Sequence, residues 1–228
     1  MTRVAVFDAY GTLLDVNAAM RAHAERLGPD WQRISGEWRA KHLEYTWVRS
    51  MVGPAQHCDF WRLARDSLAV VAARHDISDA GLLADVLGSY RRLDAYPEVP
   101  DTMRKLKSNG IARAILSNGE PTMLAEAAEA AGISDLLDDI LSVERVGVYK
   151  PDPRVYRLAT DRFGVPASEV AFFSSNPWDA FGARSFGFQV FWVNRAGQPD
   201  EYGLRGSVRE LRDLSDPPLE TAGVDAKR

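Results

Sequence analysis

The stretch VAVFDAYGTLLD, residues 4–15, begins with a short apolar run that ends directly in the carboxylate of Asp8. A near-continuous apolar run of this length is typical of a parallel strand that is covered on both faces. Gly11 and Thr12 indicate a turn immediately afterwards. Asp8 therefore lies where a buried strand ends. In an open parallel sheet this is the edge at which ligands bind, although a carboxylate there can also serve only to cap the turn.

Similar apolar runs predict three further buried strands, at 112–118, 169–175 and 189–195. The intervening segments predict helices at 100–110, 120–132 and 152–164. Each begins near a proline and ends at a glycine, which is the expected asymmetry of helix ends. Strands that alternate with helices of this length predict βαβ crossovers, and therefore an α/β fold with a doubly wound, Rossmann-like parallel sheet.

Residues 16–96 interrupt this alternation. Four segments there have the helical spacing of apolar residues, namely 17–28, 35–53, 59–76 and 79–93. One stripe in the second segment comprises Trp38, His42, Tyr45, Val48 and Val52, and one in the third comprises Phe60, Leu63, Ala64, Ser67, Leu68 and Val71. Such stripes predict helix faces that pack against a core. We therefore predict an all-helical cap domain at 16–96, inserted into a core domain formed by 1–15 and 97–228.

The composition excludes several classes of protein. With 46% hydrophobic and 26% charged residues among 228, the chain can form a substantial core. A net charge of −4 without a cluster of Lys and Arg argues against nucleic acid as a partner. No apolar run approaches the roughly 20 residues of a membrane helix, and Asp8 interrupts the first stretch too early for a signal peptide. The single cysteine, Cys58, cannot form an internal disulfide, so we expect a cytoplasmic protein without a membrane partner.

Polar residues follow three of the predicted strands. Asp8 follows the first, Ser117 and Asn118 end the second, and Ser174 and Asn176 lie at the end of the third. Each could be explained alone by a turn or a cap. Because the carboxyl ends of parallel strands meet at one edge of a sheet, we expect these side chains to lie close together.

Two further residues gain significance only from this pattern. Lys150 lies in VYKPDP, where a lysine is by itself most simply a solvated loop residue. Asp179 lies in SSNPWDAFGA, in the first turn of an expected helix, where the helix dipole alone favours a carboxylate.

Together these motifs resemble those of the haloacid dehalogenase superfamily over essentially the whole chain. FDAYGTLLD is similar to its first motif, LSNG to its second, the lysine of YKP to its third and SSNPWDAFGA to its fourth. The superfamily also places a helical cap after the first motif. The resemblance implies this α/β core with its inserted cap but leaves the reaction open, because most members are magnesium-dependent phosphatases.

Two departures from the phosphatase pattern indicate a different reaction. Phosphatases of this superfamily have Asp-x-Asp in the first motif, whereas this chain has Asp8-Ala9-Tyr10. A tyrosine, with an ordinary pKa of about 10, cannot replace that carboxylic acid. They also have a carboxylate in the fourth motif where this chain has Asn176, which leaves only Asp8 and Asp179 for an ion that prefers charged oxygen ligands. We therefore predict neither a metal nor another cofactor.

The chain is similar to the L-2-haloacid dehalogenase branch in particular, which EWRAKHLEYTWVRSMV, residues 37–52, resembles closely. This implies metal-independent hydrolysis of short L-2-haloalkanoic acids to D-2-hydroxy acids and halide. Asp8 would attack the carbon in line with the halogen to form an ester, which water would then hydrolyse. The implied catalytic residues are Asp8, Thr12, Arg39, Ser117, Lys150, Tyr156, Ser174, Asn176 and Asp179. The implied substrate contacts are Ala9, Tyr10, Arg39, Ser117, Asn118 and Trp178.

The expected roles follow from chemistry. Ser117 and nearby backbone N–H groups would hold the substrate carboxylate, while Arg39 and Asn118 with the ring edge of Trp178 would receive the halide. Lys150 would keep Asp8 ionised, and Asp179 is the expected base for the water. For Tyr156 a purely structural role stays equally open.

Two other functions stay open from the sequence: a metal-dependent phosphatase that uses Asp8, and a non-catalytic module that binds small carboxylates. One departure from the branch is Ala40, which stands where a glutamine usually follows the cap arginine. This leaves substrate size and halogen preference undetermined. The expected partner is a small 2-haloacid substrate, and the resemblance also implies a homodimer.

Overall fold

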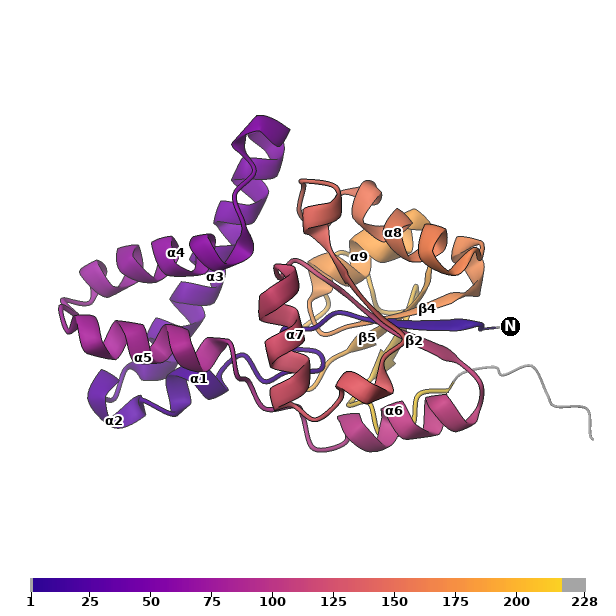
Figure 1. Ribbon diagram of the computed structural model, residues 1–228, viewed down its shortest axis with the longest axis horizontal. Helices are drawn as coiled ribbons and strands as arrows, with labels where there is room; N and C mark the ends of the chain where they lie inside the picture. Colours follow the sequence, from indigo (N-terminus) through magenta and orange to yellow (C-terminus); the bar gives the residue numbers. More distant parts are fainter. Residues whose placement is uncertain (1, 219–228) are drawn as a thin grey trace, which may run out of the picture.

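The computed structural model describes residues 2–218, which contain one six-stranded sheet (Figure 1). The strands are β1 (Val4–Phe7), β2 (Ala112–Ser117), β3 (Asp139–Ser142), β4 (Val170–Ser174), β5 (Gln189–Val193) and β6 (Arg209–Leu211). They lie in the order β3-β2-β1-β4-β5-β6, and all neighbours pair in parallel. The predicted α/β fold with a parallel sheet is confirmed, and the four predicted strands are β1, β2, β4 and β5.

Two strands were not predicted, β3 and β6. They have only four and three residues, and they form the two edges of the sheet. Their sequences, DILS and REL, lack the continuous apolar run that identified the inner strands. An edge strand is paired on one side only and needs less apolar character, which is why the sequence criterion missed them.

Four helices pack on the sheet: α6 (Val99–Ser108), α7 (Pro121–Ala130), α8 (Pro153–Phe163) and α9 (Pro177–Phe186). Figure 1 shows α6 on one side of the sheet and α8 and α9 on the other. Short 3-10 helices occupy η1 (Pro54–Gln56), η2 (Ser134–Leu136), η3 (Val143–Arg145) and η4 (Ala167–Glu169). No helix within residues 2–218 is long and apolar enough to cross a membrane.

The strand order places the polar strand ends at one point. β1 lies between β2 and β4, so successive crossovers leave it in opposite directions and open a crevice at the carboxyl ends of these strands. Asp8 continues β1 beyond its last residue, and its backbone N–H donates to the carbonyl oxygen of Phe173 in β4 at 2.9 Å. The fold thereby brings the residues after β1, β2 and β4 to the same edge.

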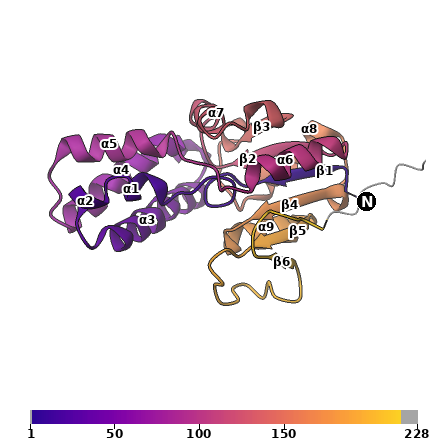
Figure 2. The same cartoon turned by 90° about the horizontal axis from the view of Figure 1, so that it is seen from below.

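Five helices lie between β1 and α6: α1 (Ala18–Arg21), α2 (Ala24–Leu27), α3 (Trp31–Val52), α4 (Phe60–Arg74) and α5 (Ala80–Tyr90). Both views show them as a group beyond the end of the sheet toward which β1 runs from the N-terminus (Figures 1 and 2). The two chain connections to this group are paired, because the N–H of Asp15 donates to Asp94 and that of Tyr96 to Leu13, each at 3.0 Å. The domain boundaries at 15/16 and 96/97 stay predictions.

The apolar stripe predicted along α3 is buried over its first half only. Trp38 and His42 are buried, whereas Val48 and Val52 are 46% and 69% exposed. Figure 1 shows the C-terminal end of α3 extending past α4 and away from the other helices. Periodicity identifies an apolar face but does not say whether anything covers it. In α4, by contrast, all six residues of the predicted stripe are buried.

The single helix predicted at 17–28 is wrong, because the structure has two four-residue helices, α1 and α2, in its place. His23 lies at the break between them, and its Nε2 is 2.9 Å from the Ser89 hydroxyl of α5. Apolar spacing alone did not reveal this tertiary contact.

Candidate active site

Asp8 is 5% exposed and accepts three hydrogen bonds at the carboxyl end of β1. Thr12 Oγ1 donates to its Oδ2 at 3.1 Å, and Asn176 Nδ2 donates to the same oxygen at 2.8 Å. Lys150 Nζ donates to the other oxygen, Oδ1, at 3.2 Å. The Thr12 hydroxyl is oriented by the backbone N–H of Ser175, which donates to it at 2.8 Å. The two carboxylate oxygens are therefore not equivalent, since Oδ2 has two donors and Oδ1 has one.

Lys150 lies between two carboxylates in the interior. Its fully buried Nζ is 3.2 Å from Asp8 Oδ1 and 2.9 Å from Asp179 Oδ2. Burial alone would lower the pKa of Lys150, but Asp179 and Asp8 more than offset this and raise it above its ordinary 10.5. The side chain is therefore an ammonium ion, and its single positive charge partly offsets the charges of the two acids.

Asp179 lies in the first turn of α9 and is fully buried. Besides Lys150, its carboxylate accepts from Ser174 Oγ at 3.0 Å and from Tyr156 Oη at 2.8 Å. Burial raises the pKa of Asp179 above its ordinary 3.8, against the lowering effect of Lys150. A carboxylate with a raised pKa is a better proton acceptor than a free aspartate, provided it stays ionised. Burial also raises the pKa of Tyr156 well above 10.0, so this phenol remains a neutral donor.

The residues after β2 present hydrogen-bond donors to the same edge. Asn118 Oδ1 accepts the backbone N–H of Lys150 at 3.0 Å, which leaves the Nδ2 group of Asn118 for a ligand. The buried Ser117 hydroxyl accepts from the N–H of Gly119 at 3.1 Å and can still donate its own proton. Within residues 2–218, the backbone N–H groups of Ala9, Tyr10 and Asn118 have no acceptor. Neighbouring unpaired N–H groups of this kind form a site for an anion.

Arg39 reaches the site from α3, on the helical side. Its Nη1 is 3.5 Å from Tyr90 Oη, and its Nη2 is 3.5 Å from the carbonyl oxygen of Tyr10. Both partners are neutral, and the half-buried guanidinium has no carboxylate partner among the described residues. Its charge is thus available to an anion. Ala40, the departure noted in the sequence, is exposed on the same helix.

Aromatic rings complete the site. Trp178, in the first turn of α9, meets Trp47 of α3 edge to face with ring centroids 5.5 Å apart, so this pair joins the helical group to the sheet. The Tyr10 ring stacks on Tyr90 at 5.4 Å and is buried. The carbonyl oxygen of Tyr10 also accepts from Asn176 Nδ2 at 3.3 Å.

The described structure joins most of the sequence candidates by direct contacts. The connected set is Asp8, Tyr10, Thr12, Arg39, Asn118, Lys150, Tyr156, Ser174, Asn176 and Asp179. Ala9, Ser117 and Trp178 are each adjacent in sequence to a member of this network. Sequence reasoning missed Tyr90, whose only signal was an aromatic residue at the end of an apolar helix, a pattern typical of core packing.

The donor chemistry of the site suits anions. Ammonium, guanidinium, amide, hydroxyl and backbone N–H groups surround Asp8, and Lys150 supplies the positive charge between Asp8 and Asp179. Residues 2–218 contain no group of three or more His, Cys, Asp or Glu side chains that could hold a metal ion.

Comparison with known proteins gives consistent matches. The model of the haloacid dehalogenase-like hydrolase family matches residues 2–187. The chain is 42% identical to (S)-2-haloacid dehalogenase 4A of Burkholderia cepacia over 94% of its own length and 92% of the relative's. It is also 42% identical to (S)-2-haloacid dehalogenase 1 of a Pseudomonas species, strain CBS-3, over 95% of both chains.

Solved structures agree with these sequence matches. A dehalogenase crystal structure superposes with a TM-score of 0.91 at 42% identity, covering 94% of each chain. The L-2-haloacid dehalogenase of Xanthobacter autotrophicus, solved with chloropropionic acid covalently bound, superposes with a TM-score of 0.86 at 33% identity, covering 95% of this chain and 96% of that one.

Proposed function

Because the chain belongs to the haloacid dehalogenase-like hydrolase family, we propose from its site that it hydrolyses short L-2-haloalkanoic acids to D-2-hydroxy acids and halide. The observation that carries this proposal is the setting of Asp8. Its carboxylate faces an ammonium, an amide and a hydroxyl, while a buried tyrosine occupies position 10. Such a carboxylate can act as a nucleophile toward carbon, and a halide leaving group requires no proton.

In the first step, one oxygen of Asp8 attacks the carbon that carries the halogen, and the carbon–halogen bond breaks. Oδ1 is the better candidate for this oxygen, because it has one donor whereas Oδ2 has two. Attack opposite to the halogen inverts the carbon centre, which converts an L substrate to a D product. The electron pair of the broken bond leaves with the halide, toward Arg39 and the Nδ2 group of Asn118.

The substrate carboxylate requires an anion site close to Asp8. The backbone N–H groups of Ala9, Tyr10 and Asn118 together with the Ser117 hydroxyl provide it, since none of these N–H groups has an acceptor within residues 2–218. Binding through backbone donors requires no extra positive charge and fixes the orientation of the substrate. Orientation matters here because only an in-line approach gives displacement.

In the second step, water attacks the carbonyl carbon of the ester, and the bond between Oδ1 and the substrate carbon is retained in the product. Negative charge then develops on Oδ2, where Thr12 and Asn176 already donate at 3.1 and 2.8 Å. Hydrogen-bond donors that are in place before the charge develops usually contribute most to stabilising the transition state in such sites. Asp179 takes a proton of the water, and as the tetrahedral intermediate collapses the bond between Cγ of Asp8 and Oδ1 breaks. Oδ1 takes up that proton and leaves as the hydroxyl oxygen of the D-2-hydroxy acid, while the water oxygen completes the restored Asp8 carboxylate.

The direct test is halide release from each enantiomer of 2-chloropropionate in buffer that contains EDTA, with Asp8→Asn measured alongside. We expect release from the L form only, unaffected by the chelator and abolished by the substitution. Magnesium-dependent hydrolysis of a phosphate ester without halide release would instead indicate a phosphatase. Saturable binding of haloacids without release of halide would indicate a binding module.

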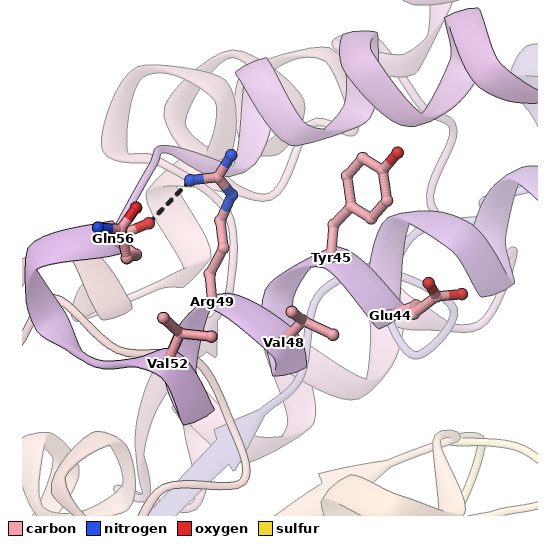
Figure 3. Close-up of a pocket in the computed structure, with 6 residues that line it drawn as sticks. All are labelled: Glu44, Tyr45, Val48, Arg49, Val52 and Gln56. Carbon is pink, nitrogen blue, oxygen red and sulfur yellow. Dashed lines mark hydrogen bonds between the residues drawn. The ribbon is translucent and has the colours of Figure 1, made fainter.

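We also propose that the chain forms a homodimer through the outer end of α3. The five large apolar residues that are exposed in residues 2–218 are Val48, Met51, Val52, Phe181 and Tyr202. Val48 and Val52 line a hollow of about 330 Å³ on α3 (Figure 3), and the other three line a neighbouring groove of about 590 Å³. Exposed apolar surface of this kind marks an interaction site, and a second copy presents the same surface.

Light scattering on the eluting protein tests this assembly. We expect a dimer mass for the unaltered chain and a monomer mass for Met51→Glu. The matched control is Ala69→Glu, at an exposed position of α4, which should remain dimeric. A monomer mass for the unaltered chain at every concentration would contradict the proposal.

A further inference from the structure

Tyr90 contacts the site, and the sequence did not indicate this role. It ends α5, is 3% exposed, and its hydroxyl oxygen is 3.5 Å from Nη1 of Arg39. We propose, as an extension of the proposed function, that Tyr90 is a positioning residue that holds Arg39 toward the departing halide.

The Tyr90 ring has little freedom to move. It stacks on Tyr10 at 5.4 Å with 13° between the planes, and it packs against Trp38 at 5.0 Å and His42 at 6.2 Å. Tyr10 in turn is two residues from Asp8 and next to the turn at Gly11. The hydroxyl of Tyr90 is thus fixed relative to the nucleophile rather than to the helical side alone.

The residue after Tyr90 anchors the same helix end to the sheet side. Arg91 Nε donates to Glu126 of α7 at 2.7 Å, and its Nη2 reaches Glu120 at 3.5 Å. Glu120 caps α7, which begins just after Asn118 and Gly119. Two neighbouring residues at the C-terminal end of α5 therefore connect the two sides of the site: Arg91 by ion pairs and Tyr90 through Arg39.

The chemical nature of the partner is also informative. A carboxylate partner would hold Arg39 more firmly, but it would neutralise the charge that an anion needs. Tyr90 is a neutral acceptor, and burial raises its pKa above 10.0 despite the opposing effect of Arg39, so it remains neutral. The hydroxyl can orient the guanidinium and leave its positive charge for the halide. The contact of 3.5 Å is long, as is common before a ligand tightens the site.

The effect of Tyr90 should depend on the leaving group. Chloride is a poorer leaving group than bromide, so its departure depends more on a donor that stabilises the developing charge. The ratio kcat/KM covers only the steps up to cleavage of the carbon–halogen bond and excludes hydrolysis of the ester. The ratio kcat/KM therefore reports the effect of Arg39 on departure of the halide.

The experiment measures kcat/KM of Tyr90→Phe with L-2-chloropropionate and L-2-bromopropionate. We expect a fall of about tenfold for the chloro substrate, the usual effect of one hydrogen bond to a charged group, and a clearly smaller fall for the bromo substrate. Phenylalanine keeps the ring contacts, and a thermal melt verifies folding. Ser89→Ala, which removes a neighbouring hydroxyl of α5 that contacts His23, should leave both values unchanged.

Arg39→Lys provides an independent variant, because lysine cannot contact both the Tyr90 hydroxyl and the Tyr10 carbonyl. It should shift the ratio between the two substrates in the same direction as Tyr90→Phe and by more. Equal losses for both substrates, or no loss in Tyr90→Phe, would overturn the role of Tyr90 while leaving the dehalogenase intact. Absence of halide release by the unaltered chain would overturn the proposed function itself.

Discussion

The two sides of the active site are built differently. On the sheet side, Asp8, Lys150 and Asp179 are buried and joined by contacts of 2.9 to 3.2 Å, and four further donors hold the two acids. On the helical side, Arg39 is half-buried and has two contacts of 3.5 Å, both with neutral oxygens. Asp8 is thus held in place before the substrate binds. The guanidinium of Arg39 is not neutralised by a carboxylate, so its charge remains available to the leaving halide. This difference suits a reaction in which the attacking oxygen of Asp8 must be held in one orientation and the halide must be able to leave.

The largest effect is expected from Lys150→Met, which removes the positive charge on the fixed side. Asp8 and Asp179 would then be two buried acids without compensation, and one of them would take up a proton. We expect kcat to fall by about a thousandfold or more, and the free energy of unfolding to fall by about 3 to 5 kcal/mol, as is usual when one partner of a buried ion pair is removed. Halide release and urea unfolding measure the two effects.

Arg3→Met is the matched control for that experiment. Arg3 forms an exposed ion pair with Glu169 at 3.4 Å, and such surface pairs contribute about 1 kcal/mol or less. If Lys150→Met cost no more stability than Arg3→Met, the ion-pair network would not be the element that fixes the nucleophile.

The second prediction separates the two chemical steps. Thr12→Val removes a donor to Asp8 Oδ2 and also the acceptor for the N–H of Ser175. Because we assign Oδ2 to the developing charge in ester hydrolysis, we expect that step to slow by about a hundredfold, the usual effect of losing one such donor. The ester should then accumulate, which intact-protein mass spectrometry detects as an added substrate residue.

Thr12→Ser keeps the hydroxyl and should retain most of the hydrolysis rate. A slow Thr12→Val enzyme that accumulates no ester would place the role of Thr12 in the first step and reverse our assignment of the two oxygens.

The sequence predicted the sheet side of the site more completely than the helical side, for a physical reason. Asp8, Asn118 and Asn176 each follow a buried strand, and parallel strands necessarily end at one edge. Their proximity is therefore a consequence of topology. Tyr90 is 51 residues from Arg39, and their contact depends on how two helices pack, which apolar periodicity does not specify.

The exposed end of α3 illustrates the same limit. Val48 and Val52 continue the spacing of Trp38 and His42, yet they are largely exposed because α3 extends past the helix that covers its first half. The edge strands β3 and β6 were missed for the opposite reason, since short strands paired on one side lack the apolar run. In both cases the sequence shows the apolar pattern of the element itself, but it does not show which other elements pack against it.

The third prediction uses pH to examine the fixed side. Asp179 must be ionised to accept a proton from water, and burial raises its pKa above 3.8, so kcat should fall with decreasing pH at higher values than for a free aspartate. On the alkaline side the pKa of Lys150 is raised above 10.5, so kcat should be retained at pH 10. Initial rates of halide release from pH 4 to about 10 give the profile.

Asp179→Asn provides the control for this profile, because its residual activity should lack the acidic limb. Loss of kcat between pH 8 and about 10 would show that the ammonium is not held between its two acids.

The smallest effect is expected on the helical side, where His42 provides a test of stability rather than of rate. His42 is buried, its Nε2 donates to the carbonyl oxygen of Phe60 at 3.0 Å, and burial lowers its pKa from 6.5 to about 3. The unfolded chain binds a proton at this residue below pH 6.5 while the folded chain does not. The contribution of His42 to the free energy of unfolding is therefore complete above pH 6.5. It is lost as the pH falls toward 3, by up to about 1.4 kcal/mol per pH unit.

Urea unfolding at pH 7.5 and at pH 5 measures this loss, and His42→Gln removes the titrating group while keeping an N–H donor. The stability difference between the two pH values should be smaller in His42→Gln than in the unaltered chain by about 1 to 2 kcal/mol. An unchanged difference in His42→Gln would mean that this buried ring admits a proton, and that the helical side is less tightly packed than its contacts indicate.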